Sequence, residues 1–355
     1  MKTKIVTVDE NLIDKSVLRE AGKILKEGGL VAFPTETVYG LGGDALNEES
    51  SAKIYAAKGR PSDNPLIVHI AEMEALPKIA KDIPQEAYAL AARYWPGPLT
   101  MIFHKTDCVP LATTGGLSTV AVRMPSNQIA RELILAAGGY VAAPSANRSG
   151  RPSPTLAKYV IEDLDGRVEM ILDGGACDIG LESTIIDFSE EKPMILRPGY
   201  ITEEMMQQVI GEVETDRTIL DASSKVAPKA PGMKYRHYAP QGNLIIVEGE
   251  EQQVIHYINE KLAEASEKGT KTGVIATDET YDGYRADVRR SLGSRKDEEA
   301  IAHHLFEILR QMDDENVELI YTESFESHGL GQATMNRLLK VAGHQIVKLL
   351  GNCET

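Results

Sequence analysis

The sequence predicts an α/β protein with two domains. Several short apolar runs end at a proline; Leu30–Phe33 is one of them. They are too short for helices and too apolar for loops, so we expect buried strands. From Asn243 onward, strand-like and helix-like patterns alternate, which is typical of a small open sheet covered by helices. A length of 355 residues also favours two domains.

The first domain is expected over residues 1–210, followed by a linker over 211–241 and a C-terminal α/β domain over 242–355. In the first domain the patterns predict strands at 5–8, 30–33, 66–70, 100–104, 119–124, 140–143, 182–188 and 194–199, and helices at 14–26, 50–57, 88–94 and 203–221. In the second they predict strands at 244–247, 273–276 and 317–321, and helices at 252–265, 298–312 and 333–342. Alternation in the strand at 66–70 puts His69 on the face opposite Val68.

Polar side chains follow several of the predicted strands where each meets a proline. Thr35, Arg123, Ser145 and Asn147 lie at such junctions. Because ligands of α/β proteins collect where strand ends meet loops, we expect one shared pocket. Taken alone, a Thr or Ser here is more often a turn or cap residue. An arginine inside an apolar strand is harder to explain without a ligand, because a buried guanidinium must find an anion.

Two further basic groups have structural as well as functional interpretations. His69 fits a satisfied, half-buried imidazole as well as a ligand contact. Arg197 precedes a proline at a strand end, as Arg123 does, and a surface salt bridge explains it equally well.

The segment 231–240 has an unusual composition for a linker, because cationic, imidazole and aromatic groups lie between prolines. Lys234, Arg236 and His237 can all donate to phosphate, and two tyrosines can exclude water. We therefore expect a lid over the site of the first domain, with a basic surface linker as the alternative.

Composition limits the classes of partner. The chain has 53 acidic and 38 basic residues and a net charge of −15, which disfavours non-specific binding to nucleic acid or anionic lipid. No signal peptide or membrane-spanning run is visible, so a cytoplasmic protein is expected. Cys108, Cys177 and Cys353 are widely spaced and show no C-x-x-C pattern, so we expect free thiols.

Common phosphate and metal motifs do not explain the chain. We find no G-x-x-x-x-G-K-[ST] loop and no H-E-x-x-H pair. Residues 40–45 match G-x-G-x-x-A, but Pro34 ends the preceding strand well before them, so we interpret this match as chance.

Two short motifs carry a resemblance to a known family. Lys58-Gly59-Arg60 and Ser145-Ala146-Asn147 resemble the K-x-R and S-x-N signature of the YrdC-like family, and residues 33–42 and 145–150 are similar to it throughout. Arg197-Pro198-Gly199, the 231–240 segment and the second domain resemble its long, two-domain threonylcarbamoyl-AMP synthase form. The resemblance implies a twisted YrdC-like mixed sheet with helices, followed by a smaller Rossmann-like domain.

The resemblance also implies an activity. That family joins L-threonine, bicarbonate or CO2, and ATP into L-threonylcarbamoyladenylate and releases pyrophosphate, for the t6A modification of tRNA. A tRNA threonylcarbamoyltransferase complex would receive the product, and direct tRNA binding is expected to be weak or absent. Mg2+ would accompany ATP, held largely by phosphates and water, since we find no dedicated carboxylate cage.

Site residues follow from the resemblance. Lys58 and Arg60 are expected to be catalytic. The residues expected to bind L-threonine are Thr35, His69, Arg123 and Ser183. Those expected around ATP are Lys58, Arg60, Asn64, Thr119, Ser145, Asn147, Ser153, Arg197, Arg236 and His237. No metal-binding residue is expected.

Two other functions fit parts of the pattern. The family resemblance also implies a concave, positively charged surface suited to double-stranded RNA. A double-stranded RNA-binding translation or ribosome-associated factor is therefore the alternative, although the net charge of the chain opposes it. A carbamoyl-transfer enzyme of the hydrogenase-maturation kind would carry paired C-x-x-C zinc motifs, which this chain lacks.

Overall fold

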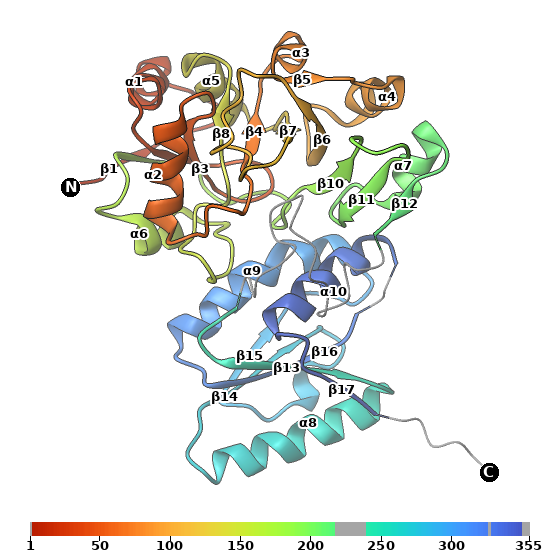
Figure 1. Ribbon diagram of the computed structural model, residues 1–355. Coiled ribbons are helices and arrows are strands. Elements are labelled where there is room, and N and C mark those ends of the chain that lie inside the picture. Colours follow the sequence, from red (N-terminus) through yellow and green to blue (C-terminus); the bar gives the residue numbers. More distant parts are fainter. Residues whose placement is uncertain (1, 217–238, 326–327, 350–355) are drawn as a thin grey trace. The chain divides into compact units, whose positions relative to one another are not determined.

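The computed structural model describes residues 2–216, 239–325 and 328–349 (Figure 1). These residues form two compact units. The first comprises residues 2–149 and 153–216, and the second comprises residues 150–152, 239–325 and 328–349. Cys353 and most of the 231–240 segment lie outside the described residues.

The first unit contains a mixed sheet with helices around it. Its strands are β1 (Lys4–Thr7), β2 (Val31–Phe33), β3 (Gly40–Asp44), β4 (Ile67–His69), β5 (Ala80–Lys81), β6 (Leu99–Lys105), β7 (Thr119–Arg123), β8 (Val141–Ala142), β9 (Met170–Asp173), β10 (Thr184–Asp187), β11 (Met194–Arg197) and β12 (Glu214–Thr215). Its helices are α1 (Lys15–Lys26), α2 (Glu48–Lys58), α3 (Leu76–Ile79), α4 (Gln85–Tyr94), α5 (Gln128–Ala136), α6 (Ala157–Leu164) and α7 (Glu203–Ile210), with a 3-10 turn η1 (Met73–Ala75).

The strand order is β1-β9-β2-β3-β8-β4-β7-β6-β10-β11-β12, and β5 pairs with β6. The sheet contains both parallel pairs, such as β4 with β7, and antiparallel pairs, such as β6 with β7. The predicted mixed sheet is confirmed. Its central strands are buried on both faces, which explains why they appear in the sequence as continuous apolar runs.

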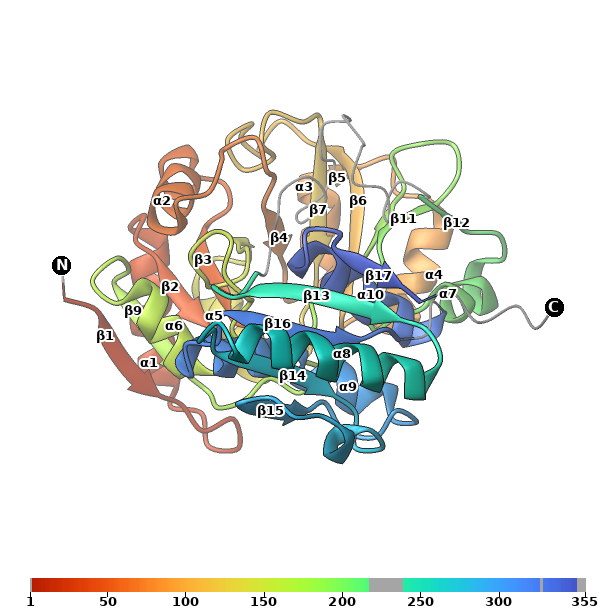
Figure 2. The ribbon, with the colours of Figure 1, turned by 90° about the horizontal axis from the view of Figure 1, so that it is seen from below.

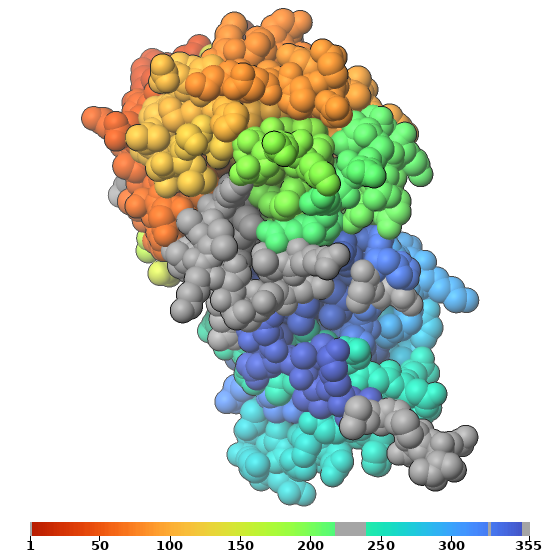
Figure 3. All heavy atoms as spheres, turned by 45° about the vertical axis from the view of Figure 1, so that its right-hand side comes forward, coloured from red at the N-terminus to blue at the C-terminus, as the bar shows by residue number. Residues whose placement is uncertain are grey.

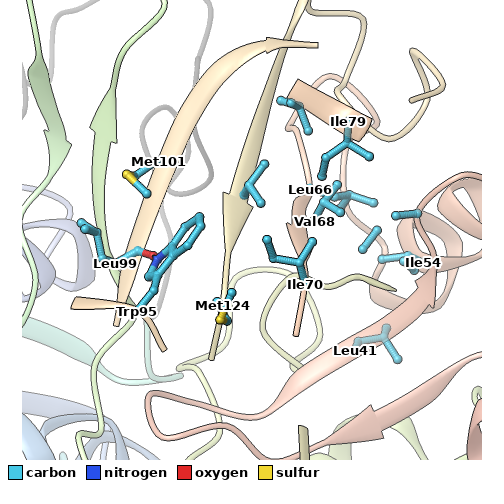
Figure 4. Packing of buried hydrophobic residues seen from close by; sticks show 14 of the residues in the cluster. Leu41, Ile54, Leu66, Val68, Ile70, Ile79, Trp95, Leu99, Met101 and Met124 are labelled. Atoms are coloured by element: carbon cyan, nitrogen blue, oxygen red, sulfur yellow. The ribbon is translucent and has the colours of Figure 1, made fainter. Parts of the chain in front are cut away.

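A large apolar core anchors the middle of this sheet (Figure 4). Leu66, Val68 and Ile70 belong to it, whereas His69 points to the other face, as the alternation predicts. Trp95 belongs to the same core and donates its indole N–H to the Leu99 carbonyl at 2.6 Å, so the one polar atom of its side chain is satisfied.

Helix α7 packs beside helix α4, and the green and orange segments that carry them adjoin in Figure 3. The Tyr94 hydroxyl donates to the Met205 carbonyl at 2.7 Å across this contact. The helix predicted over 203–221 is wrong in its length, because Gly211 (φ 78°) ends α7 and β12 follows. The glycine-rich strand β3 was not predicted, since its residues carry no side-chain alternation.

The second unit is an open parallel sheet between helices. Its strands are β13 (Asn243–Glu248), β14 (Thr272–Ala276), β15 (Val288–Ser291), β16 (Leu319–Glu323) and β17 (Ile346–Lys348); its helices are α8 (Glu251–Ser266), α9 (Glu298–Asp314) and α10 (Gly329–Val341), with a 3-10 turn η3 (Tyr281–Gly283). The strand order is β15-β14-β16-β13-β17, and all pairs are parallel. Helix α8 covers one face, and α9 and α10 cover the other (Figures 1 and 2).

The predicted Rossmann-like fold of this unit is confirmed. The strand predicted at 317–321 begins two residues later, and β15 and β17 were not predicted because they are only partly buried. Residues 150–152 belong to this unit: the fully buried Arg310 donates to the Pro152 carbonyl at 3.0 Å from Nε and 2.7 Å from Nη2. In the described part of the chain, no helix has the length and apolar character needed to span a bilayer.

Candidate active site

Three neighbouring strands place polar side chains side by side on one face of the first unit's sheet. In the β4–β7 register His69 lies opposite Arg123, and in the β6–β7 register Thr100 lies opposite Arg123. All three are buried. Residues this polar are rare in the middle of a sheet, so their convergence marks a site rather than ordinary core.

Arg123 contacts the loop that follows β2. Its Nη1 donates to Thr37 Oγ1 at 2.8 Å, and its Nη2 lies 2.8 Å from Glu36 Oε1. Thr35 Oγ1 lies 2.9 Å from Thr37 Oγ1 and donates to the Val38 carbonyl at 2.7 Å. The structure therefore brings together Thr35 and Arg123, two residues that the sequence places 88 positions apart.

The Glu36–Arg123 pair is close but incompletely hydrogen-bonded. Both side chains are about one-twentieth exposed (4% and 5%). Neither Glu36 oxygen accepts a hydrogen bond in the described structure, and Arg123 Nε and Nη2 donate none, because the 2.8 Å contact lacks hydrogen-bond alignment. Buried charged groups in this condition are costly, so the pair is suited to receive a polar ligand. Sequence reasoning missed Glu36; its position between two threonines just after a buried strand was the available signal.

A second group of contacts joins β6, β10 and β11. Ser183 Oγ lies 2.7 Å from Thr100 Oγ1, and Arg197 donates to the Ser183 carbonyl from Nε (2.9 Å) and to Ser183 Oγ from Nη2 (3.1 Å). Arg197 is 3% exposed, so the surface salt-bridge interpretation is wrong. Thr100 was also missed, because a threonine inside a strand pattern gives no functional signal. Ser183 and Arg197 are linked to the Arg123 strand by Thr100, which contacts Ser183 and lies opposite Arg123 in the sheet.

The titratable groups next to this network are held neutral. Burial, followed by the charge of Arg123, lowers the pKa of His69 from 6.5 to about 3, and its Nδ1 lies 3.1 Å from the Ile67 carbonyl. With the proton on Nδ1, His69 donates to that carbonyl and its Nε2 is the other polar atom of the ring. Burial also raises the pKa of the Cys177 thiol, with a smaller contribution from the charge of Glu36. Cys177 is therefore not a thiolate nucleophile at neutral pH.

The two signature motifs contact each other directly. Lys58, at the end of α2, is 3% exposed and donates to the carbonyls of Ser145 and Asn147 and to Asn147 Oδ1. These three contacts use the three donors of an ammonium group. Ser145 Oγ donates in turn to Asn147 Oδ1. Lys58 therefore holds the S-x-N loop against α2.

The remaining residues expected around ATP are spread over the same unit. Ser153, fully buried, donates to Glu182 Oε1 at 2.6 Å, one residue before Ser183. Arg60 donates to the Asn64 and Pro65 carbonyls, and Asn64 is 1% exposed with its Oδ1 unsatisfied among the described residues.

Thr119 does not join the group around Arg123. It begins β7, and Arg123 ends the same strand, about 13 Å away at roughly 3.3 Å per residue. Residues at both ends of one strand cannot share a single strand-end pocket. The residues expected to bind the two substrates therefore do not all lie at one strand end; some lie farther along the sheet.

Arg236 and His237 lie outside the described residues, so their contacts and the lid stay predictions. Among the residues that are described, no cluster of three or more His, Cys, Asp or Glu side chains could hold a metal ion.

Comparison with known proteins gives matches in both units. Residues 23–199 match the Sua5/YciO/YrdC family model described as "Telomere recombination", and residues 201–343 match the model of the threonylcarbamoyl-AMP synthase C-terminal domain. The "Threonylcarbamoyl-AMP synthase" of Pyrococcus abyssi is 50% identical over 98% of this chain and 100% of its own length, and that of Bacillus subtilis is 45% identical over the same shares.

A solved structure agrees with these matches. The crystal structure of P. abyssi Sua5 complexed with L-threonine is 49% identical, covers 98% of this chain and 100% of that one, and superposes with a TM-score of 0.93. These comparisons do not favour the RNA-binding alternative. With half of its residues identical to a synthase along nearly the whole chain, this protein belongs to the threonylcarbamoyl-AMP synthase family.

Proposed function

We propose that this chain makes L-threonylcarbamoyladenylate from L-threonine, bicarbonate or CO2, and ATP, with release of pyrophosphate. The observation that carries the proposal is the buried Arg123, which forms an ion pair with the buried Glu36 and lies opposite Thr100, a member of the Thr100–Ser183–Arg197 group. Two of the named synthases share 45–50% of their residues with the chain over nearly its full length, and this supports the same activity here.

L-Threonine fits the polar groups around Arg123. The guanidinium would bind the α-carboxylate, since arginine matches a carboxylate with parallel N–H donors. The hydroxyls of Thr35 and Ser183 and the neutral ring of His69 can hydrogen-bond the substrate hydroxyl. The similar P. abyssi Sua5 was crystallised as a complex with L-threonine, which supports threonine as the ligand of this site.

ATP would lie next to threonine, on the side of Arg197. Because Arg197 donates to the carbonyl oxygen and to Oγ of Ser183, a phosphate near Arg197 and a threonine near Ser183 would be neighbours. Asn64, with its unsatisfied amide oxygen, and Thr119 would contact the nucleotide farther along the sheet. Arg60, Ser145, Asn147 and Ser153 complete the proposed set.

The chemistry requires no protein nucleophile. The threonine amine attacks CO2 and loses a proton, which forms an N–C bond and a carbamate; starting from bicarbonate, one water is released. A carbamate oxygen then attacks the α-phosphorus of ATP, and the bond to the β-phosphate oxygen breaks, so pyrophosphate leaves. Positioning and charge neutralisation by Arg197, Arg60 and Lys58 would carry catalysis. The protonated Cys177 thiol is consistent with a direct displacement.

Lys58 has a double role in this proposal. Its donors are engaged by the S-x-N loop, so it positions Ser145 and Asn147 and adds a fixed positive charge beneath them. Mg2+ would arrive with ATP and be held by phosphate oxygens and water. The product would pass to a tRNA threonylcarbamoyltransferase complex for t6A synthesis, and the net charge of −15 favours weak or no direct tRNA binding.

Mass spectrometry of the reaction product tests the proposal. The full chain, given ATP, L-threonine and ¹³C-labelled bicarbonate, should form an adenylate that carries one ¹³C. Omitting threonine should abolish the product. Formation of only ADP or AMP under these conditions would contradict the proposed function.

A further inference from the structure

The second unit has a feature that adenylate synthesis does not use. In its sheet, β13 and β16 are neighbours, yet the chain leaves them in opposite directions: from β13 through α8 to β14 on one side, and from β16 through α10 to β17 on the other. The two helices cover opposite faces (Figure 2). Because the two connections leave toward opposite faces of the sheet, a crevice is expected between them outside the carboxyl ends of β13 and β16, which is where open α/β sheets bind ligands.

A cavity occupies this position. Its volume is about 220 Å3, and it is lined from β13, the first turn of α8, the end of β16, Tyr284 and Arg295. A cavity of this volume holds several water molecules and therefore has room for a small organic molecule. Val247 and Val254 also lie at the cavity, and both are almost completely buried (0% and 4% exposed).

One wall of the cavity is a charge pair between the buried Glu323 and the partly exposed Arg295. Glu323, at the end of β16, is 3% exposed and is held by Arg295, by the Thr280 hydroxyl and by the Tyr284 hydroxyl at 2.8 Å. Arg295 also donates to the Ser324 carbonyl at 3.1 Å. Burial, followed by the charge of Glu323, raises the pKa of Tyr284, so its hydroxyl stays a donor at neutral pH. This wall carries no net charge.

The remaining ionised group of the lining is a carboxylate. Glu251 is exposed in the first turn of α8, has no ion-pair partner in the described residues and lies near enough to Tyr284 to influence its titration. The neighbouring Glu250 adds a second negative charge at this helix end. Because the Glu251 carboxylate already occupies the position where a helix N-terminus attracts anions, an anionic ligand is disfavoured in the cavity and a cationic one favoured.

We propose that this cavity at the carboxyl ends of β13 and β16 binds a small organic amine, with its ammonium group on the Glu251 carboxylate. A bare metal ion does not fit, because no cluster of three or more suitable ligand side chains lies among the described residues. This site belongs to the second unit alone and is independent of the proposed synthase reaction.

Calorimetric titration of the full chain, without ATP or threonine, tests the proposal with three four-carbon probes. The probes are 1,4-diaminobutane, neutral 1,4-butanediol and the dianion succinate. We expect 1,4-diaminobutane to bind one per chain, butanediol to bind more weakly and succinate not to bind. Saturating L-threonine should leave diamine binding unchanged, which places it outside the first unit's site. Displacement by threonine, tighter binding of succinate, or no diamine binding at about millimolar concentration would overturn the proposal.

Two matched variants locate the site. Glu251→Gln should weaken 1,4-diaminobutane binding about tenfold, the loss of one charge-assisted contact at a partly open site. Glu250→Gln removes another exposed carboxylate, one residue away, that does not line the cavity, so its diamine affinity should stay within about twofold of the parent. Equal weakening in both variants would mean non-specific attraction to an acidic surface and would refute the site.

Discussion

Removing the guanidinium of Arg123 should damage both stability and threonine binding, for reasons that can be separated. Arg123→Met leaves the Glu36 carboxylate, 4% exposed, without its partner. Breaking a buried ion pair on one side costs about 3–5 kcal/mol of unfolding free energy, because a buried charge is left uncompensated. The double variant Arg123→Met/Glu36→Gln buries no charge, so its stability should return to within about 2 kcal/mol of the parent.

Threonine binding should not recover in the double variant. Hydrogen bonds to a charged group contribute about 1.5–3 kcal/mol, so losing the partner of the substrate carboxylate should weaken binding about 10- to 100-fold in both variants. The two measurements therefore diverge: stability returns, whereas affinity does not.

Stability is measured by urea unfolding followed through Trp95, the single tryptophan of the chain, which is 8% exposed in the first unit. Threonine affinity is measured by calorimetric titration. Arg93→Met, an exposed arginine of α4, is the control and should change neither. Undiminished threonine binding by Arg123→Met, or a double variant as unstable as the single one, would refute the reasoning.

Three further outcomes are expected. Adenylate synthesis should be slower with valine than with threonine, in favourable cases by roughly 10⁴-fold, because the polar groups around Arg123 would be left unpaired. Equal product from both amino acids would contradict the assignment of the pocket. The pKa of His69 is about 3 in the folded state and 6.5 in the unfolded state, so its contribution to stability is complete above pH 6.5 and is lost as the pH falls towards 3, by up to about 1.4 kcal/mol per pH unit. His69→Gln should flatten this pH dependence of the free energy of unfolding, measured with urea. An unchanged pH dependence would show that other groups cause it. Arg60→Ala should impair ATP binding or turnover and leave threonine affinity intact in calorimetry, the reverse of Arg123→Ala, and identical losses in both variants would refute the division of roles.

The sequence predicts the fold class because its signals are local. The apolar runs at 30–33 and 66–70 and the alternation after Asn243 each report on a few residues, and strands β2, β4 and β13 follow from them. Strand β3 could not be found in this way, because Gly40–Asp44 has almost no side chains to show a period of two; it is a strand because β2 and β8 pair with it.

The site was predicted less completely, since its geometry depends on contacts between distant residues. Arg123 was identified because a charge in an apolar strand is anomalous by itself. Glu36 and Thr100 were not identified, because only their contacts with Arg123 and Ser183 in the folded protein place them at the site. Lys58 was expected to face phosphates, yet its ammonium contacts carbonyls of the S-x-N loop, a tertiary arrangement that the K-x-R spacing does not contain.

Pyrophosphate exchange tests the central claim most directly. If a threonine carbamate attacks the α-phosphorus of ATP, labelled pyrophosphate should be incorporated into ATP only when L-threonine and bicarbonate are both present. Exchange with threonine alone, in CO2-free buffer, would mean that the threonine carboxylate is activated instead, and no exchange under any condition would contradict reversible adenylate formation at this site.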